Sequence, residues 1–137
     1  MMDLPQPDLS PPNSSRSVKV DPKYIDYWRQ RTANQAEQQT QAMDQAWREV
    51  RQMAQCLRKE FGAQRILVFG SLVRGRFTPE SDIDLAADHI PPARYFEAVA
   101  RANDFSQRWV DLKPLEALTP HFRDRVLATG VEVDESH

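Results

Sequence analysis

Two acidic residues, Asp82 and Asp84, lie two positions apart in a short segment rich in apolar residues. Because side chains of a β-strand alternate between its faces, both carboxylates are expected on one face, with Ile83 and Leu85 on the core side. Two ionised carboxylates about 4 Å apart repel each other by about 4 kcal/mol at an effective dielectric constant of about 20. A cation would remove this conflict, and oxygen ligands without Cys or His favour Mg²⁺ or Mn²⁺. An isolated Asp-x-Asp is more often a turn followed by an edge-strand charge, so the pair alone leaves both interpretations open.

A Gly-Ser pair, Gly70 and Ser71, follows the apolar segment Arg65–Phe69. Glycine allows the backbone to turn sharply at the end of a strand, and Ser71 would then begin a helical turn with its hydroxyl and nearby N–H groups directed outward. Such a corner binds phosphate groups. Most Gly-Ser pairs are ordinary turns, so this pair gains meaning only from the acidic residues that follow it.

A third acid, Asp111, lies between two apolar residues of a later segment and shares its strand face with Trp109 and Lys113. If that segment forms a strand beside the one that carries Asp84, the three carboxylates form a cluster able to hold two metal ions. One of these ions could then activate an attacking hydroxyl. Taken alone, Asp111 could equally be a charge on an exposed strand.

A long helix is predicted ahead of these residues, from the cap Asp21 and the first-turn Pro22 to Phe61, with Gly62 as its C-terminal stop. Its second half has apolar residues at three- and four-residue spacing and should pack on the core. Its first half begins with aromatic residues and continues as a Gln-rich, polar stretch. Those aromatics could pack against the same chain or form a surface for a partner, and the sequence favours neither.

The remaining elements alternate between short apolar runs and helical patterns. Strands are predicted at Arg65–Phe69, Ile83–Ala87 and Gln107–Leu112. Helices are predicted after Pro91 and Pro92, with Phe96, Val99 and Ala100 on one face and a break at Asn103, and between the cap Thr119 and Gly130. This order predicts an α/β (α+β) fold in which helices cover a small mixed β-sheet.

The stretch from Gly70 to Leu85 resembles the DNA polymerase beta-like nucleotidyltransferase superfamily, whose pattern is Gly-Ser, a spacer, Asp-x-Asp and a third acid on a later strand. It is more closely similar to the minimal nucleotidyltransferases, in which Gly-Ser, three residues including an Arg, a Gly, a short loop and Ser-Asp-Ile-Asp-Leu follow at this spacing. The resemblance covers about residues 43–133. It implies the polymerase beta-like fold, preceded here by a long helical arm that the family pattern does not include.

The resemblance also implies a role for each matching residue. Gly70, Ser71, Arg74 and Ser81 would bind the nucleotide, and Asp82, Asp84 and Asp111 would be both catalytic and metal-binding. The implied cofactor is Mg²⁺, as two ions, with Mn²⁺ possible, and the implied substrate is ATP. An acceptor hydroxyl would attack the α-phosphorus and expel pyrophosphate.

In the minimal family the partner is commonly a helical HEPN protein that acts as a toxic ribonuclease. The resemblance therefore implies an antitoxin that transfers AMP from ATP to a hydroxyl of this partner, which the family's pattern makes a tyrosine. Two alternatives stay open. The chain could be a binding antitoxin or complex subunit that neutralises its partner by contact alone, or a transferase that acts on a small molecule or an RNA end.

Length and composition limit the remaining possibilities. The 137 residues, with a net charge of -2, have room for one domain and give no general attraction to nucleic acid. We expect a flexible Pro/Ser-rich tail at residues 1–20, the helical arm at 21–42 and the nucleotidyltransferase domain at 43–137. The single cysteine, Cys56, excludes an internal disulfide framework. No apolar run approaches the ~20 residues that span a bilayer, and no signal peptide is recognisable, so we expect a cytoplasmic protein without membrane contact.

Overall fold

The sheet that carries the acidic residues has four strands in the order β3-β2-β1-β4. The computed structural model describes residues 21–134, so the tail predicted for residues 1–20 lies outside the described part of the chain. The strands are β1 (Ile66–Phe69), β2 (Ile83–Ala87), β3 (Val110–Pro114) and β4 (Val131–Glu132). β1 pairs antiparallel with both β2 and β4, whereas β2 and β3 are parallel. The predicted small mixed sheet is confirmed.

The helices are α1 (Pro22–Phe61), α2 (Ser71–Arg74), α3 (Tyr95–Asn103) and α4 (Pro120–Thr129), with short 3-10 helices η1 (Pro92–Arg94) and η2 (Leu115–Ala117). α1 is one uninterrupted helix, as predicted. It begins at a side-chain cap, because the Asp21 carboxylate accepts a hydrogen bond of 3.0 Å from the backbone N–H of Lys23. No helix within residues 21–134 combines the length and the apolar character needed to cross a membrane.

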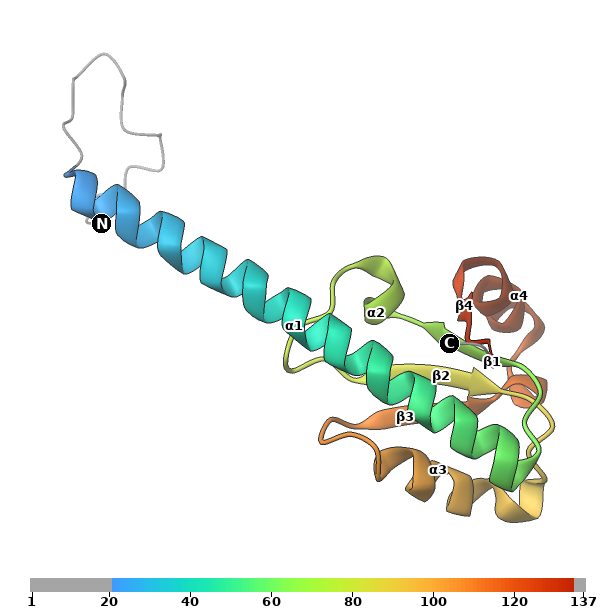
Figure 1. Cartoon of the computed structure of the whole chain (residues 1–137). Helices are drawn as coiled ribbons and strands as arrows, with labels where there is room; N and C mark the ends of the chain where they lie inside the picture. The colour runs from blue at the N-terminus through green and yellow to red at the C-terminus, as the bar shows by residue number, and fades with distance from the viewer. Residues whose placement is uncertain (1–20, 135–137) are drawn as a thin grey trace, which may run out of the picture. The chain divides into compact units, whose positions relative to one another are not determined.

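The two faces of the sheet belong to different hydrophobic clusters. Ile66 and Val68 of β1 pack with the buried side of α1 and with α3, whereas Leu67 packs with α4 and η2 on the opposite face. Ile83 and Leu85 of β2 join the first cluster, which confirms that they point to the main core. Figure 1 shows the green part of α1 passing across the sheet while α4 lies near β1 and β4. Since neighbouring side chains alternate, Asp84 lies on the face of α4, away from the main core.

The chain divides into two compact units, one ending at Gln35 and the other beginning at Ala36. In the second unit, α1 contributes a buried stripe that already includes Ala42. In the first unit, every described side chain from residue 21 to residue 35 is exposed. The aromatic side chains there do not pack into the core, and the boundary predicted between residues 42 and 43 stays a prediction.

One predicted boundary is wrong for an identifiable reason. β3 begins at Val110 and not at Gln107. The Asn103 side chain donates to the carbonyl of Val110 and accepts from its N–H, at 3.1 and 2.8 Å, and so holds the preceding residues in a turn. On α3 the buried residues are Ala98 and Ala102, while Phe96 is 85% exposed. Small side chains let this helix lie close to the core, which the larger ring of Phe96 would prevent.

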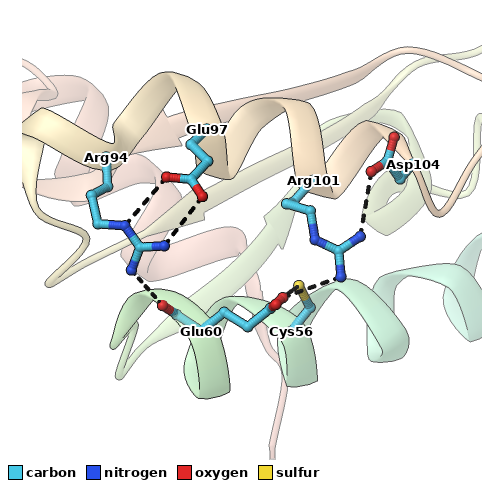
Figure 2. A network of polar contacts seen from close by, with 6 residues as sticks. All are labelled: Cys56, Glu60, Arg94, Glu97, Arg101 and Asp104. Carbon is cyan, nitrogen blue, oxygen red and sulfur yellow. Dashed lines mark hydrogen bonds and ion pairs between the residues drawn. The ribbon is translucent and has the colours of Figure 1, made fainter.

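A network of polar contacts joins the end of α1 to η1 and α3 (Figure 2). Arg101 reaches the Glu60 carboxylate at 3.2 Å, and the Cys56 thiol donates to the same carboxylate at 2.6 Å. The charged groups are largely exposed, so these ion pairs add little to stability. Burial, and then the contact with Glu60, raise the pKa of Cys56 to about 11. The thiol is therefore protonated at neutral pH.

A buried carboxylate, Asp88, closes the turn between α1 and β1. It accepts hydrogen bonds from the backbone N–H groups of Gln64 and Arg65, at 3.1 and 2.6 Å. Burial acts to raise the pKa of Asp88, but the N–H of Arg65, the His89 ring and the N–H of Gln64 together outweigh it, so the pKa lies below its usual 3.8. The ionised form is the one that stabilises the fold.

Asp88→Asn is expected to destabilise the protein at neutral pH by about 1–3 kcal/mol, since it weakens hydrogen bonds to an ionised acceptor. A lowered folded pKa gives stability that is complete above the unfolded value near 3.8 and is lost as the pH falls through the folded value. The difference between the two proteins should therefore shrink below about pH 4. Denaturant unfolding at several pH values measures it. A difference that stays constant down to pH 3 would contradict this assignment.

Candidate active site

Two of the three predicted acids lie side by side on neighbouring strands. Asp84 is in the middle of the sheet, in register with Phe69 of β1 on one side and with Asp111 of β3 on the other. The condition set for Asp111, that its strand lies beside that of Asp84, is met. Asp82 is exposed and directly precedes β2. The structure therefore places a carboxylate pair on the sheet and a third carboxylate at the entrance of the same strand.

Gly70 forms the corner between β1 and α2, directly against Asp84. Its φ of 78° and ψ of −148° belong to a region that only glycine adopts readily. A Cβ atom at this position would lie 2.3 Å from Oδ2 of Asp84, well inside contact distance. The glycine is thus required both for the turn and for the space that the carboxylate occupies. Ser71 follows as the first residue of α2, as the Gly-Ser prediction requires.

The electrostatic state of Asp84 reflects its neighbours. Burial, and next the charge of Asp111, raise the pKa of Asp84 above its usual value, while Lys113 and Arg74 act in the opposite direction. Two carboxylates in register on adjacent strands cannot both ionise at low cost without positive charge nearby. A cation on this face of the sheet would therefore stabilise the ionised form of the pair.

Lys113 supplies one positive charge at this pair, since its Nζ lies 2.7 Å from Oδ2 of Asp111. Within residues 21–134 no three acidic, His or Cys side chains converge closely enough, as they lie, to hold a metal ion. Asp84 and Asp111 nevertheless fit a divalent metal in two respects, since they supply hard oxygen ligands and their strands place them in register. The sequence showed that Lys113 shares a strand face with Asp111, but not that it binds this carboxylate.

The loop between α2 and β2 is held by Arg108, a residue outside the sequence motif. Phe77 anchors the loop in the core, and the guanidinium of Arg108 lies 4.5 Å from the centre of its ring. The same guanidinium donates to the carbonyls of Thr78 and Ser81, at 3.1 and 2.8 Å. This clamp fixes the turn that leads directly into Asp82.

The two remaining predicted nucleotide-binding residues lie in the same region. Ser81 uses its hydroxyl within the turn, where it accepts a hydrogen bond of 2.9 Å from the N–H of Thr78. Arg74, at the end of α2, is exposed. Their contacts with a nucleotide stay predictions.

Replacing Arg108 by Met should loosen the loop without moving the sheet. The variant keeps an apolar stem over Phe77 but loses two hydrogen bonds from a charged donor, so we expect a stability loss of about 1–2 kcal/mol. Since Asp82 follows the clamped turn, catalytic efficiency should fall about tenfold. Arg76→Met, which removes an exposed charge from the same loop, is the control. Equal effects of both variants on unfolding and activity would show that the clamp has no special role.

Solved structures with the same arrangement of elements are known. One is assigned to the minimal nucleotidyltransferases and is 26% identical, covering 63% of this chain and 91% of that chain with a TM-score of 0.55. A toxin–antitoxin structure with AMP-PNP is 23% identical over 63% of this chain and 72% of that chain, also with a TM-score of 0.55. A mutant of the toxin–antitoxin MntA–HpeT is 20% identical, over 61% and 70% of the two chains, with a TM-score of 0.52.

The search among curated proteins found no match to this chain. A family model does match, and it is described as the nucleotidyltransferase domain. Its match runs over residues 50–132, more than half of the chain, and includes the glycine corner, the carboxylate pair and the closing helix α4. The polymerase beta-like fold expected from the sequence is confirmed, and this chain belongs to the nucleotidyltransferase domain family.

Proposed function

We propose that this nucleotidyltransferase transfers AMP from ATP to a hydroxyl group, a tyrosine in our proposal, of a HEPN-type toxin and thereby acts as its antitoxin. The observation that carries the proposal is the register of Asp84 with Asp111, directly against the Gly70 corner. This arrangement sets the Gly70 turn, which we propose binds phosphate, next to a carboxylate pair. An enzyme that acts on the α-phosphate of ATP with metal ions needs both.

In this proposal the Gly70 backbone and the Ser71 hydroxyl bind the triphosphate, and Arg74 neutralises part of its charge. Asp82 and Asp84 hold a divalent ion that accompanies the nucleotide, and Asp111 helps to hold a second. Such ions, when bound, stabilise charge on the oxygens that enter and leave the α-phosphorus. The Arg108 clamp keeps Asp82 in position, and the core beneath β2 keeps Asp84 fixed while the acceptor approaches.

The acceptor is inferred to come from a separate protein. Within residues 36–134 the sheet and its helices form one compact unit. Two of the similar structures are toxin–antitoxin complexes, one of them with AMP-PNP. These neighbours support a toxin partner and an adenine nucleotide, while the HEPN type and the tyrosine come from the family resemblance of the motif.

A second candidate is an antitoxin that acts by binding alone. It is favoured by the first unit, where Tyr24, Tyr27 and Trp28 are 59%, 56% and 48% exposed on one stretch of helix. Exposed aromatic side chains grouped in this way are typical of protein interaction surfaces. In this case the carboxylates would not be needed for neutralisation.

The test is to incubate the full chain with ATP labelled at the α-phosphate and with Mg²⁺, with and without the product of the neighbouring gene. An Asp82→Asn/Asp84→Asn variant and an Asp44→Asn control, altered on exposed α1, are assayed beside it. Label on the partner that needs Mg²⁺ and disappears only in the double variant supports AMP transfer. If no label reaches the partner, and both the double variant and the Asp44→Asn control still form a tight complex that neutralises the toxin, the binding antitoxin replaces the proposal.

A further inference from the structure

The ion pair between Lys113 and Asp111 occupies an oxygen that the proposed metal would need. Both residues lie on β3, two positions apart and therefore on the same face of the strand. The partner of Lys113 on β2 is Ala86, whose small side chain leaves space on this face. The lysine side chain turns back along the strand, and its Nζ reaches Oδ2 of Asp111 at 2.7 Å. The contact is part-buried, with side chains 37% and 38% exposed.

We propose that Lys113 is an internal counter-ion that occupies Asp111 until metal and nucleotide bind together. This inference rests on the proposed function, since it concerns the same site. A divalent ion on Asp111 would lie beside the ammonium group and be repelled by it, so one cation must leave when the other binds. Lys113 therefore weakens the binding of metal to the nucleotide-free protein. As long as no metal is bound, it also neutralises part of the charge of the carboxylate pair.

The nucleotide offers the displaced ammonium another partner. A lysine carries its charge on a flexible four-carbon stem, so it can move from Asp111 to a phosphate oxygen without a change in the backbone. Nucleotide would then favour metal binding, and by reciprocity metal would favour nucleotide binding. The residue thus couples the two ligands and limits occupation of the site by metal alone.

The test compares the affinity of the nucleotide-free protein for Mn²⁺, measured by calorimetry or by the electron paramagnetic resonance signal of the free ion. Lys113→Met should bind Mn²⁺ about tenfold more tightly than the unaltered chain, since one charge–charge contact is removed. Lys113→Arg, which keeps the charge, should stay close to the unaltered chain. Lys59→Met, on the exposed side of α1, is the matched control and should not change the affinity.

The role of Asp111 is tested in the same assay. In an Asp111→Asn background, Lys113→Met should increase the Mn²⁺ affinity much less, because the lysine then has no carboxylate to occupy and only its charge near Asp84 is removed. With AMP-PNP present, the gain from Lys113→Met should also become smaller. Thermal unfolding of each variant without metal establishes that it is folded.

Two results would overturn the inference, and they differ in what they mean for the site. If Lys113→Met and the unaltered chain, both folded, bind Mn²⁺ equally well, Lys113 does not compete with the metal, while the proposed function stands. If neither protein binds Mn²⁺, with or without AMP-PNP, the metal site and the proposed function fail together.

Discussion

Asp84→Asn is expected to lower the catalytic efficiency of the proposed AMP transfer by about three orders of magnitude while leaving the protein as stable as before, or more stable. Asparagine has nearly the same shape as aspartate, but it removes the negative charge of Asp84, which lies between Asp82 and Asp111. The raised pKa of Asp84 means that its ionised form costs the fold stability at neutral pH. The variant should therefore lose activity and gain resistance to denaturant in the absence of metal.

The stability gain expected for Asp84→Asn depends on pH in a defined direction. A raised folded pKa means that the folded state binds the proton more tightly, so the cost of Asp84 appears as the pH rises through the unfolded value near 3.8 and is complete above the folded value. The stability gain of Asp84→Asn should be present at neutral pH and should vanish below about pH 4. Denaturant unfolding without metal measures it, with Asp44→Asn as control. A variant that unfolds more easily at neutral pH, or that still transfers AMP normally, would contradict the assignment.

Gly70→Ala is expected to destabilise the protein by about 3 kcal/mol and to reduce transfer about a hundredfold. The new Cβ would meet Oδ2 of Asp84 at 2.3 Å and must push this carboxylate out of place. The chain offers a matched control in Gly75, which also has a positive φ, 72°, but has open space at its Cβ position. Gly75→Ala should cost only the backbone strain, about 1–2 kcal/mol, and should leave most of the activity.

A second substitution separates the clash between a Cβ at residue 70 and the Asp84 carboxylate from the backbone strain at residue 70. In an Asp84→Ala background the nearest remaining side-chain atom is Cβ of residue 84, at 3.4 Å, which is an ordinary contact. Gly70→Ala should then cost less than in the unaltered chain and keep only its backbone strain, which exceeds that of Gly75→Ala because a φ of 78° with a ψ of −148° is open mainly to glycine; unfolding experiments analysed as a double-mutant cycle measure this. If Gly70→Ala costs the same in both backgrounds, the close approach of the corner to Asp84 is not what requires glycine.

The sequence predicted those parts of the fold that depend on local patterns. β2 begins at Ile83 and ends at Ala87 as predicted, and α1 runs without interruption from Pro22 to Phe61. These segments have clear periodicity and strong caps, so neighbouring residues determine them. β3 was misplaced because the turn before it depends on the Asn103 side chain, which bonds to residues on both sides of the turn. The two-residue strand β4 carries no periodic signal at all.

The candidate site was predictable to the extent that its residues form a linear motif. The corner of Gly70 and the acids Asp82 and Asp84 follow each other in the sequence, while Asp111 was recognised as a candidate from its place in an apolar segment and received its role from the resemblance. The roles of Lys113 and Arg108 required the fold. Lys113 lies near Asp84 only because β3 pairs in parallel with β2. Arg108 contacts a loop about thirty residues earlier in the chain. The long-range contact of Arg108 leaves no trace in residue spacing.

The buried thiol near the end of α1 makes this protein convenient for spectroscopy. Cys56 is the single cysteine of the chain, and it stays protonated at neutral pH because its pKa is about 11. Maleimide reagents react with thiolates, so the native residue should resist them. A cysteine introduced at an exposed position such as Gln35 would accept a spin label or fluorophore selectively, without prior removal of Cys56. Labelled in this way, the helix would report directly on when the proposed toxin partner binds and when it leaves.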